Sequence, residues 1–351
     1  MAVSATIGVS VMVGSFRVSV DDWLGNTLQS DVYVGVPRGS LEPTIIDDVR
    51  ALDGVTAIST SRRAWLESSS GRVQLIAIDM APGSYQGTRL RRADPDDAWR
   101  QFDDQGAVMV SDSYAYRTGT AAGERIELKT DRGDVAVNVA AVYQSYDANG
   151  GAIMMSRATY DRLFDDRRVD SIGLYLKAGV SPDVIMEQVR AISAGRQSLI
   201  MNSNERIRDL SLGIFDRTFV ITNVLYWLAV GVAVIGILGA MLAFQLERAR
   251  EFGILRALGM TPGQTGFLVT AQTATIGLLA GVAALPLGLV MAWVLIEVIN
   301  RRAFGWQIDM TVTAAPLGWA LVIAVGAALA GGLIPAWRAA QVPPALAMRE
   351  E

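Results

Sequence analysis

The side chains that most often carry out covalent chemistry are missing from this sequence. It contains no Cys and no His, so it lacks a thiolate nucleophile, the commonest general base, and thiolate or imidazole ligands for a metal. The hydroxyls of Ser68–Ser70 have no such base to activate them, and we interpret this run as a flexible hairpin tip. The sequence therefore predicts no catalytic residues, and we do not expect an enzyme.

Nucleotide chemistry is also excluded within this chain. A phosphate-binding loop of the Walker type needs a glycine directly before a Lys-Ser or Lys-Thr pair. Only two lysines are present, Lys129 and Lys177, and Lys129 follows Leu128 instead of a glycine. We therefore expect no bound cofactor here, and any ATP that drives the protein must be hydrolysed by a separate polypeptide.

Two acidic or turn-like segments could suggest a metal site. The first contains Asp94, Asp96, Asp97, Asp103 and Asp104, and we interpret it as a solvated loop with a helical piece. The second, residues 147–151 (DANGG), lacks the later Asp and Glu ligands of a calcium loop and reads as a turn. No metal site is predicted.

Composition divides the chain into two parts. Hydrophobic residues make up 51% of the 351 residues, and they dominate after Arg217, whereas the region between Arg17 and Arg217 is charged and mixed. The net charge is −4 and no strongly basic region is present. Binding to nucleic acid needs a basic face to neutralise phosphates, so we exclude nucleic acid as a partner.

Four apolar stretches have the composition of membrane-spanning helices: residues 1–17, 218–246, 265–299 and 314–335. The first is shorter than the roughly twenty residues needed to cross the hydrocarbon layer, so we interpret it as a spanning helix with a truncated start. A cleaved or interfacial segment is the alternative.

The third stretch carries two signals for helix geometry. Pro286 predicts a kink or a break, because proline removes a helical hydrogen bond and clashes with the preceding turn. Gly277 and Gly281 are spaced as G-x-x-x-G and predict close packing against a neighbouring helix.

Residues 18–203 read as one folded domain of mixed strands and helices, of the α+β class. Helices are expected at 43–52 and 181–192, the second with Ser181 as N-cap and Pro182 at its first position. Strand-like runs occur at 31–36, 73–78, 107–110, 125–130, 135–143, 152–155 and 171–177. Residues 204–217 are predicted to form a stalk helix that leads into the second span.

Topology follows from these elements. Four spans place both termini on one side and the large domain on the other, with 300–313 as a loop on the side of the domain. Segment 247–264 and the tail 336–351 then lie with the termini, and their arginines fit the cytoplasmic excess of positive charge. Arg301 and Arg302, in the loop on the opposite side, are an exception to that rule.

Segment 247–264, which begins ERAREFGILRALGMT, separates the second and third spans. On a helical wheel Phe252, Ile254, Leu255 and Leu258 share one arc, Arg250 and Arg256 lie opposite, and Glu251 falls inside the apolar arc. Gly253 and Gly259 permit close approach or end the helix. Either the helix lies on the membrane surface or it docks on a partner protein.

The motif at Glu247–Thr261 resembles the most recognisable segment of the FtsX-like permease family, the membrane half of MacB/LolC-type (type VII) ABC transporters. The ending GGLIPAWRAAQVPPALAMRE resembles the close of that family's last span. The arrangement of one span, a large external domain and three further spans is also similar. The opening residues resemble the start of the second repeat of long, ten-span members, so the chain resembles their C-terminal half.

This resemblance implies an external domain of the MacB periplasmic core type in the bacterial inner membrane. It implies a dimer of ABC ATPase subunits as partner, together with a second permease copy or a companion permease half, membrane lipids and a periplasmic partner protein. The residues it assigns to ATPase coupling are Arg250, Glu251, Phe252, Gly253, Ile254, Leu255, Arg256, Leu258 and Gly259.

Two functions fit these implications. One is a permease subunit that transmits ATP-driven motion to its external domain and exports or extracts a lipid, lipoprotein or peptide. The other is a regulatory transmembrane lever that activates a cell-wall hydrolase or senses antimicrobial peptides. The partner of the external domain discriminates between them.

Overall fold

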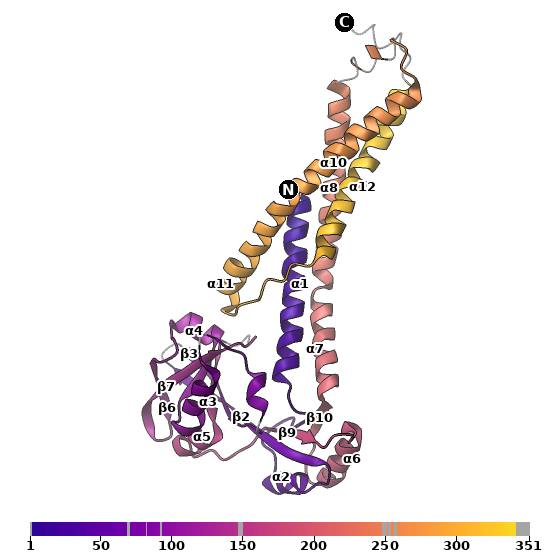
Figure 1. Ribbon diagram of the computed structural model, residues 1–351. Coiled ribbons are helices and arrows are strands. Elements are labelled where there is room, and N and C mark those ends of the chain that lie inside the picture. Colours follow the sequence, from indigo (N-terminus) through magenta and orange to yellow (C-terminus); the bar gives the residue numbers. More distant parts are fainter. Residues whose placement is uncertain are drawn as a thin grey trace. The chain divides into compact units, whose positions relative to one another are not determined.

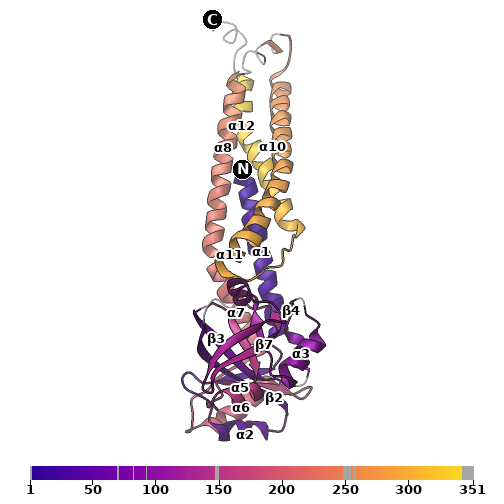
Figure 2. The ribbon, with the colours of Figure 1, turned by 90° about the vertical axis from the view of Figure 1, so that its left-hand side faces the viewer.

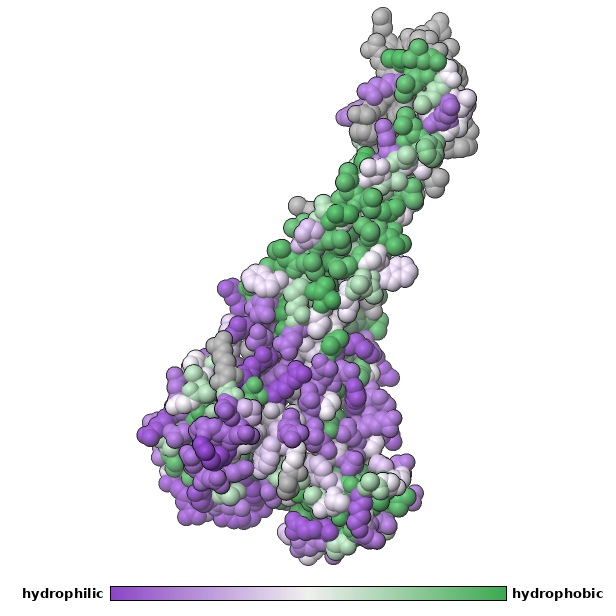
Figure 3. Space-filling view, in the orientation of Figure 1, coloured by the Kyte–Doolittle hydropathy of each residue, from purple (hydrophilic) through white to green (hydrophobic). Residues whose placement is uncertain are grey.

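The chain divides into two units, seen in Figure 1, a computed structural model. Residues 2–68, 71–81, 83–91, 93–146, 150–247, 251, 254–255 and 258–341 are described. The helical unit comprises Met1–Phe16, Asp216–Val298 and Asp309–Glu351, and the mixed unit comprises Arg17–Phe215 and Ile299–Ile308. Figure 3 shows hydrophobic side chains gathered over the helical unit and hydrophilic side chains over the mixed unit.

The mixed unit is built on a ten-stranded sheet in the order β10-β1-β9-β2-β3-β8-β5-β7-β4, with β6 paired to β7. Two pairs, β3 with β8 and β5 with β7, are parallel, and the others are antiparallel. The strands are β1 (Val32–Gly35), β2 (Val55–Ser68), β3 (Gly71–Asp79), β4 (Leu90–Arg91), β5 (Val108–Ser111), β6 (Arg125–Thr130), β7 (Gly133–Tyr143), β8 (Ala152–Ser156), β9 (Ser171–Leu176) and β10 (Ile200–Ser203).

Six α-helices and one short 3-10 helix accompany the sheet within residues 28–215: α2 (Pro43–Arg50), η1 (Ser84–Gly87), α3 (Pro95–Asp104), α4 (Asp112–Thr118), α5 (Arg157–Leu163), α6 (Pro182–Ser193) and the first part of α7 (Asn204–Thr218). In Figure 2, β3 and β7 face the viewer and α3 lies to their right. All seven predicted strand runs and both predicted helices are present, which confirms the α+β class of this unit.

Strand β2 joins two halves of the sheet, and the sequence patterns did not predict it. Its first part, Val55–Ser61, pairs with β9, whereas Thr60–Ser68 pairs with β3. One apolar core packs α2 and α6 on β1 and β9, and another packs α4 and α5 on β3, β5, β6, β7 and β8. Figure 1 shows β2 running between these two groups of helices.

Helix starts in the mixed unit follow local side-chain chemistry. The Asp94 carboxylate accepts hydrogen bonds from the backbone N–H groups of Asp96 and Asp97 and so caps α3, which is the helical piece predicted within the acidic loop. Helix α6 begins at Pro182 as predicted, but the Ser181 side chain makes no capping hydrogen bond. The pyrrolidine ring of Pro182 fixes φ near the helical value, so the helix starts there without a capping hydrogen bond from Ser181.

The helical unit contains the long apolar helices. They are α1 (Ala2–Thr27), which continues into the mixed unit, α8 (Val220–Glu247), α10 (Pro262–Trp293) and α12 (Ala314–Gln341). A π-helix, η2 (Val294–Asn300), and α11 (Arg301–Phe304) continue α10. The α1, α10 and α12 helices share a small core of Ile7, Val11, Ala284, Ala292 and Ala320.

Within the described residues, two helices are long and apolar enough to cross a membrane, Val3–Thr27 and Pro262–Phe304. This count does not confirm four spans, although α8 and α12 occupy the positions of the other two predicted spans. The first helix is longer than expected, because it ends at Thr27 and not at residue 17. No proline lies between Arg17 and Thr27, and the helix continues through Gly25.

Candidate functional site

The predicted coupling segment is described in part. Glu251, Ile254, Leu255, Leu258 and Gly259 belong to the described residues, whereas Arg250, Phe252, Gly253 and Arg256 lie outside them. Its described end is one helical turn, in which the Leu258 N–H donates to the Ile254 carbonyl and the Met260 N–H donates to the Leu255 carbonyl. Gly259 ends the turn with φ of +104°, a conformation that favours glycine.

Helix α10 starts immediately after this turn. The Thr261 hydroxyl accepts from the Gln264 N–H at 3.3 Å, and the Gln264 side chain accepts from the Thr261 N–H at 3.0 Å. This reciprocal capping box, with Pro262 at the first helical position, fixes the direction in which the chain enters α10. The turn therefore has a defined connection to the helix that follows.

The apolar side chains of this turn face solvent. Leu258 is 80% exposed, Ile254 and Leu255 are also exposed, and so is Glu251. Glu251 was expected to fall inside an apolar arc; of that arc, the described residues Ile254, Leu255 and Leu258 are exposed, and Glu251 is exposed as well. An exposed apolar group of this kind beside charged residues can bind a partner surface.

The predicted packing glycines lie against α12. A Cβ added at Gly277 would collide with the Ala328 Cβ, and one added at Gly281 would lie 3.0 Å from Leu321 Cδ1 and 3.2 Å from Ala324 Cβ. Both glycines are buried. The absence of a side chain at each position lets the two helix backbones approach closely.

A second pair of glycines, which the sequence analysis did not single out, packs α10 on α1. A Cβ added at Gly288 would lie 2.6 Å from Ile7 Cβ, and one added at Gly8 would lie 2.9 Å from Met291 Cγ. Between the two contact regions, Pro286 is exposed and α10 runs through it without interruption. Of the two predicted outcomes, a kink or a break, the continuous helix excludes the break.

Residues 299–308 form the most unexpected part of the site. Residues 300–313 were expected to be a loop, yet Asn300 ends a π-helix, α11 follows it, and Ile299–Ile308 fold as part of the mixed unit. The Gln307 N–H points at Asp112 Oδ2 at 3.5 Å, and the Ser113 and Ser145 N–H groups donate to Asp112 Oδ1 at 3.0 and 3.4 Å. Asp112 thus connects this segment to α4 and to the end of β7.

The electrostatics of Asp112 are unusual for a carboxylate. Its side chain is buried, and burial raises the pKa of Asp112 to about 6, because the charged form loses its hydration. The three backbone N–H groups and the Arg91 guanidinium lower the pKa in part but do not compensate for the desolvation. The carboxyl group therefore changes charge near neutral pH.

Aromatic rings hold the same segment. Trp23 of α1 lies edge-on to Tyr146 at 5.5 Å between ring centroids, and Tyr146 lies edge-on to Trp306 at 5.8 Å. Phe304 stacks on Trp306 at 4.9 Å with the two rings nearly parallel. Such pairs contribute roughly 0.5–1.5 kcal/mol each beyond burial.

The backbone of the segment is also specified. Gly305 has φ of +81°, and a Cβ there would lie 3.1 Å from Ser113 Cα. The Asn300 side-chain amide donates to the Trp306 carbonyl at 3.2 Å. Glycine is therefore required at position 305 by both conformation and space.

Helices α1 and α7 are joined within the mixed unit. The Arg208 guanidinium pairs with Asp21 at 2.7 Å, and the Asn204 side chain donates to the carbonyls of Leu28 and Ser30. The predicted stalk helix 204–217 corresponds to α7 and begins at these contacts. Its start is thus tied to the end of α1.

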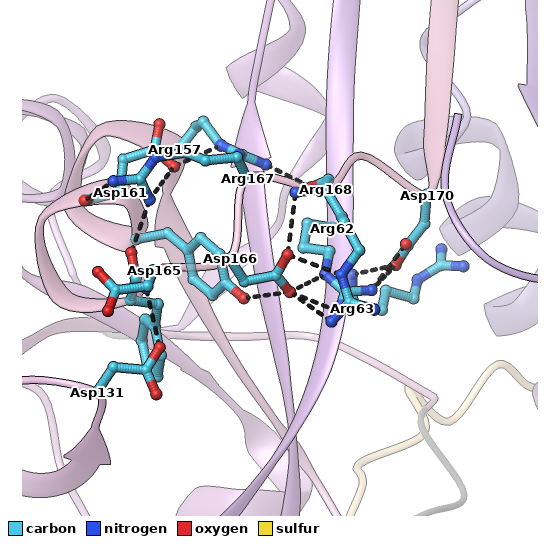
Figure 4. A network of polar contacts seen from close by, with 12 residues as sticks. Arg62, Arg63, Asp131, Arg157, Asp161, Asp165, Asp166, Arg167, Arg168 and Asp170 are labelled. Atoms are coloured by element: carbon cyan, nitrogen blue, oxygen red, sulfur yellow. Dashed lines mark hydrogen bonds and ion pairs between the residues drawn. The ribbon is translucent and has the colours of Figure 1, made fainter. Parts of the chain in front are cut away.

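A polar network joins the two chain connections between the halves of the sheet (Figure 4). These connections are β2 and the segment between α5 and β9. From β2, Arg62 pairs with Asp166 at 2.6 Å and with Asp170 at 2.8 Å, and Arg168 also pairs with Asp166. The Arg62 side chain is only 12% exposed, so it fixes the two connections against each other.

Among the residues that the structure describes, no group of three or more acidic side chains is placed to hold a metal ion. Residues 147–149 of the DANGG turn, and Ser69 and Ser70 of the serine run, lie outside the described residues.

Comparison with known proteins identifies the C-terminal region. Residues 223–344 match the FtsX-like permease C-terminal family. The whole chain is 37% identical, over 363 aligned residues, to an uncharacterised ABC transporter permease protein of Mycobacterium tuberculosis, and it covers 42% of the length of that relative.

Two solved structures are similar to about half of this chain. One is the periplasmic region of MacB from Actinobacillus actinomycetemcomitans, with a TM-score of 0.38 and 10% identity, covering 53% of this chain and 94% of that chain. The other is the extracellular domain of the ABC-type transporter YknZ from Gram-positive bacteria, with a TM-score of 0.35 and 11% identity, covering 50% of this chain and all of that chain. Residues 223–344 therefore form an FtsX-like permease domain, in a chain similar along its full length to an ABC transporter permease.

Proposed function

We propose that this chain is a permease subunit in a bacterial inner membrane that transmits ATP-driven motion to its mixed unit. The mixed unit lies on the side of the membrane away from the cytoplasm. The observation that carries the proposal is the position of residues 299–308. This segment connects η2 and α12 in the chain, yet it is folded into the mixed unit through Asp112 and Trp306. A movement of either helix is therefore passed to the mixed unit by covalent connection.

The input of this mechanism is the turn at 251–260. Its exposed Ile254, Leu255 and Leu258 provide an apolar surface for a separate ATPase dimer, because this chain has no phosphate-binding loop. The capping box at Thr261 and the glycines of α10 then connect that surface to α12 and α1. The FtsX-like match over 223–344 supports the assignment.

The output consists of three chain segments that enter the mixed unit: the second part of α1, the first part of α7, and residues 299–308. The first two are joined by Asp21, Arg208 and Asn204, so they act on β1 and β10 together. The third acts on α4 and β7. The two points of action lie on different halves of the sheet. A displacement of one point relative to the other changes how the two halves are arranged within the mixed unit.

The mixed unit exports or extracts a hydrophobic cargo such as a lipid, lipoprotein or peptide. A second copy or a companion permease half completes the membrane part. The alternative is a regulatory lever acting on a cell-wall hydrolase or sensing antimicrobial peptides, and the same geometry favours neither. Affinity purification of the full chain from membranes separates them: co-purifying lipid or lipoprotein supports transport, and a periplasmic hydrolase supports regulation.

ATPase coupling is tested with a substitution in the exposed turn. Leu258→Asp places a charge in the proposed contact, and we expect at least tenfold weaker capture of the partner ATPase dimer. Leu210→Asp, at an exposed position of α7 in the mixed unit, is the matched control and retains capture. Equal ATPase capture by the Leu258→Asp variant and the unaltered chain would refute the proposed docking surface.

A further inference from the structure

Helix α11 presents basic and aromatic side chains together on an exposed surface. Arg301, Arg302 and Phe304 are all exposed, and Phe304 retains 54% of its accessible surface. Tyr116 of α4, also exposed, lies beneath Arg301, with the guanidinium carbon 5.4 Å from the ring centroid. Arg301 and Tyr116 are thus in contact at the surface of the mixed unit, and Arg302 and Phe304 are exposed on the same short helix as Arg301.

This surface is held in a fixed geometry. The Phe304 ring is stacked on Trp306, which is only 7% exposed, and Gly305 reverses the chain between them against Ser113. The Asn300 amide fixes the start of the turn to the Trp306 carbonyl. A preorganised surface loses little conformational entropy when it binds a ligand.

The positive charge of the surface is not neutralised within the molecule. Among the described residues, no carboxylate forms an ion pair with Arg301 or Arg302. The closest acidic group of α4, Asp112, is directed at the backbone N–H of Gln307 instead. The two arginines are thus available to an anion.

The chain also determines which anion is near. The apolar helical stretch Pro262–Phe304, a candidate membrane span, ends with α11, so Arg301 and Arg302 lie in its last turn. Arginine and aromatic side chains at the end of a span meet the phosphate and glycerol layer of a bilayer. This placement also accounts for two arginines on the side of the membrane where positive charge is otherwise depleted.

We propose that α11 is a binding site for phospholipid headgroups of the outer leaflet, with Arg301 and Arg302 as ligands of the lipid phosphate. Phe304 and Tyr116 lie against the glycerol and upper acyl region. The site holds the segment 299–308 at the membrane surface while its other side is docked on Asp112. The inference rests on the membrane orientation of the proposed function but not on ATPase coupling or on the cargo.

The test is lipid retention by the full chain purified in a neutral detergent. Phosphatidylglycerol is titrated and bound lipid is counted by native mass spectrometry. An arginine near an anionic lipid surface is worth about fivefold in affinity, so Arg301→Gln with Arg302→Gln is expected to weaken binding roughly 25-fold. The double variant Arg301→Lys/Arg302→Lys keeps the charge and is expected to retain most of the binding.

The matched control is Arg38→Gln with Arg50→Gln, which removes the same charge from exposed positions on the β1–α2 side of the mixed unit. Unchanged lipid retention in the Arg301/Arg302 glutamine variant, or an equal loss in the control, would overturn the proposal. Circular dichroism of each variant verifies folding. Capture of the ATPase in the same samples separates the lipid-site proposal from the ATPase-coupling proposal. A variant that loses lipid but still captures the ATPase is altered in the lipid site alone.

Discussion

Asp112 offers the sharpest test of how residues 299–308 are held to the mixed unit. The carboxyl group is 9% exposed and accepts from the N–H groups of Ser113, Ser145 and Gln307. Asp112→Asn replaces it with a neutral group of the same shape that still accepts through one oxygen. The substitution therefore removes the charge while leaving most of the packing.

The expected magnitude follows from the pKa. Because the pKa of Asp112 rises from 3.8 in the unfolded chain to about 6 in the folded one, the folded state binds more protons between these values. Its stability is highest below pH 3.8 and falls as pH rises through 6, in total by roughly 3 kcal/mol. The asparagine variant lacks this loss but forfeits about 1 kcal/mol for the Gln307 contact at every pH.

The assay is thermal unfolding of the detergent-solubilised chain between pH 4.5 and 8, followed by circular dichroism. The unaltered chain has already lost about 1 kcal/mol at pH 4.5, so the variant is expected to be about as stable there and about 2 kcal/mol more stable at pH 8. With about 2–4 °C for each kcal/mol in a domain of this size, the difference in midpoint changes by roughly 4–8 °C across the range. Asp183→Asn, in the first turn of α6, is the control for a general charge effect.

One result would refute the reasoning: a difference in midpoint between Asp112→Asn and the unaltered chain that is constant with pH. It would mean that the carboxyl group is not desolvated by the contacts of residues 299–308. A pH-dependent difference of the same size in the Asp183→Asn control would have the same consequence.

Three further changes test the remaining contacts. Arg62→Met leaves Asp166 and Asp170 without their shared partner and should destabilise the mixed unit by about 3 kcal/mol, seen as a lower denaturant midpoint; a change below about 0.5 kcal/mol contradicts the clamp. Gly277→Leu should separate α10 from α12 and lower the yield of folded chain in membranes. Gly266→Leu, at a position with open space around it, is the control and should leave that yield unchanged. Gly305→Ala should cost about 1–3 kcal/mol in the same unfolding assay, and no change would argue against the positive φ.

Local chemistry explains what could be predicted about the candidate site. The apolar turn ending at Gly259 and the G-x-x-x-G face of α10 depend on neighbouring residues in the chain, so their patterns are visible without the fold. The role of Gly288 could have been found by extending the small-residue pattern from Gly281 by seven residues. Asp112 had no signal, because Gln307, whose N–H points at its carboxylate, lies 195 positions away in the sequence.

Strand β2 is an element of the fold that local sequence patterns could not predict. Its sequence TSRRAWLES places two arginines in the middle of a strand, which breaks the apolar alternation on which strand prediction depends. Arg62 is accommodated because Asp166 and Asp170 neutralise it, and both arrive from a segment about a hundred residues later. A pattern confined to a short window cannot detect that compensation.

The sequence by itself determined the α+β class, most of the strands, the apolar stretches, the turn before α10, and the absence of thiol, imidazole and Walker-type phosphate-binding loop from these 351 residues. Each depends on residue type or on spacing within a few turns. Only the tertiary structure decided that α1 continues to Thr27, that β2 joins two cores, and that residues 299–308 belong to the mixed unit. These features depend on burial and hydrogen bonds between distant segments, whose free energy appears only when the segments meet.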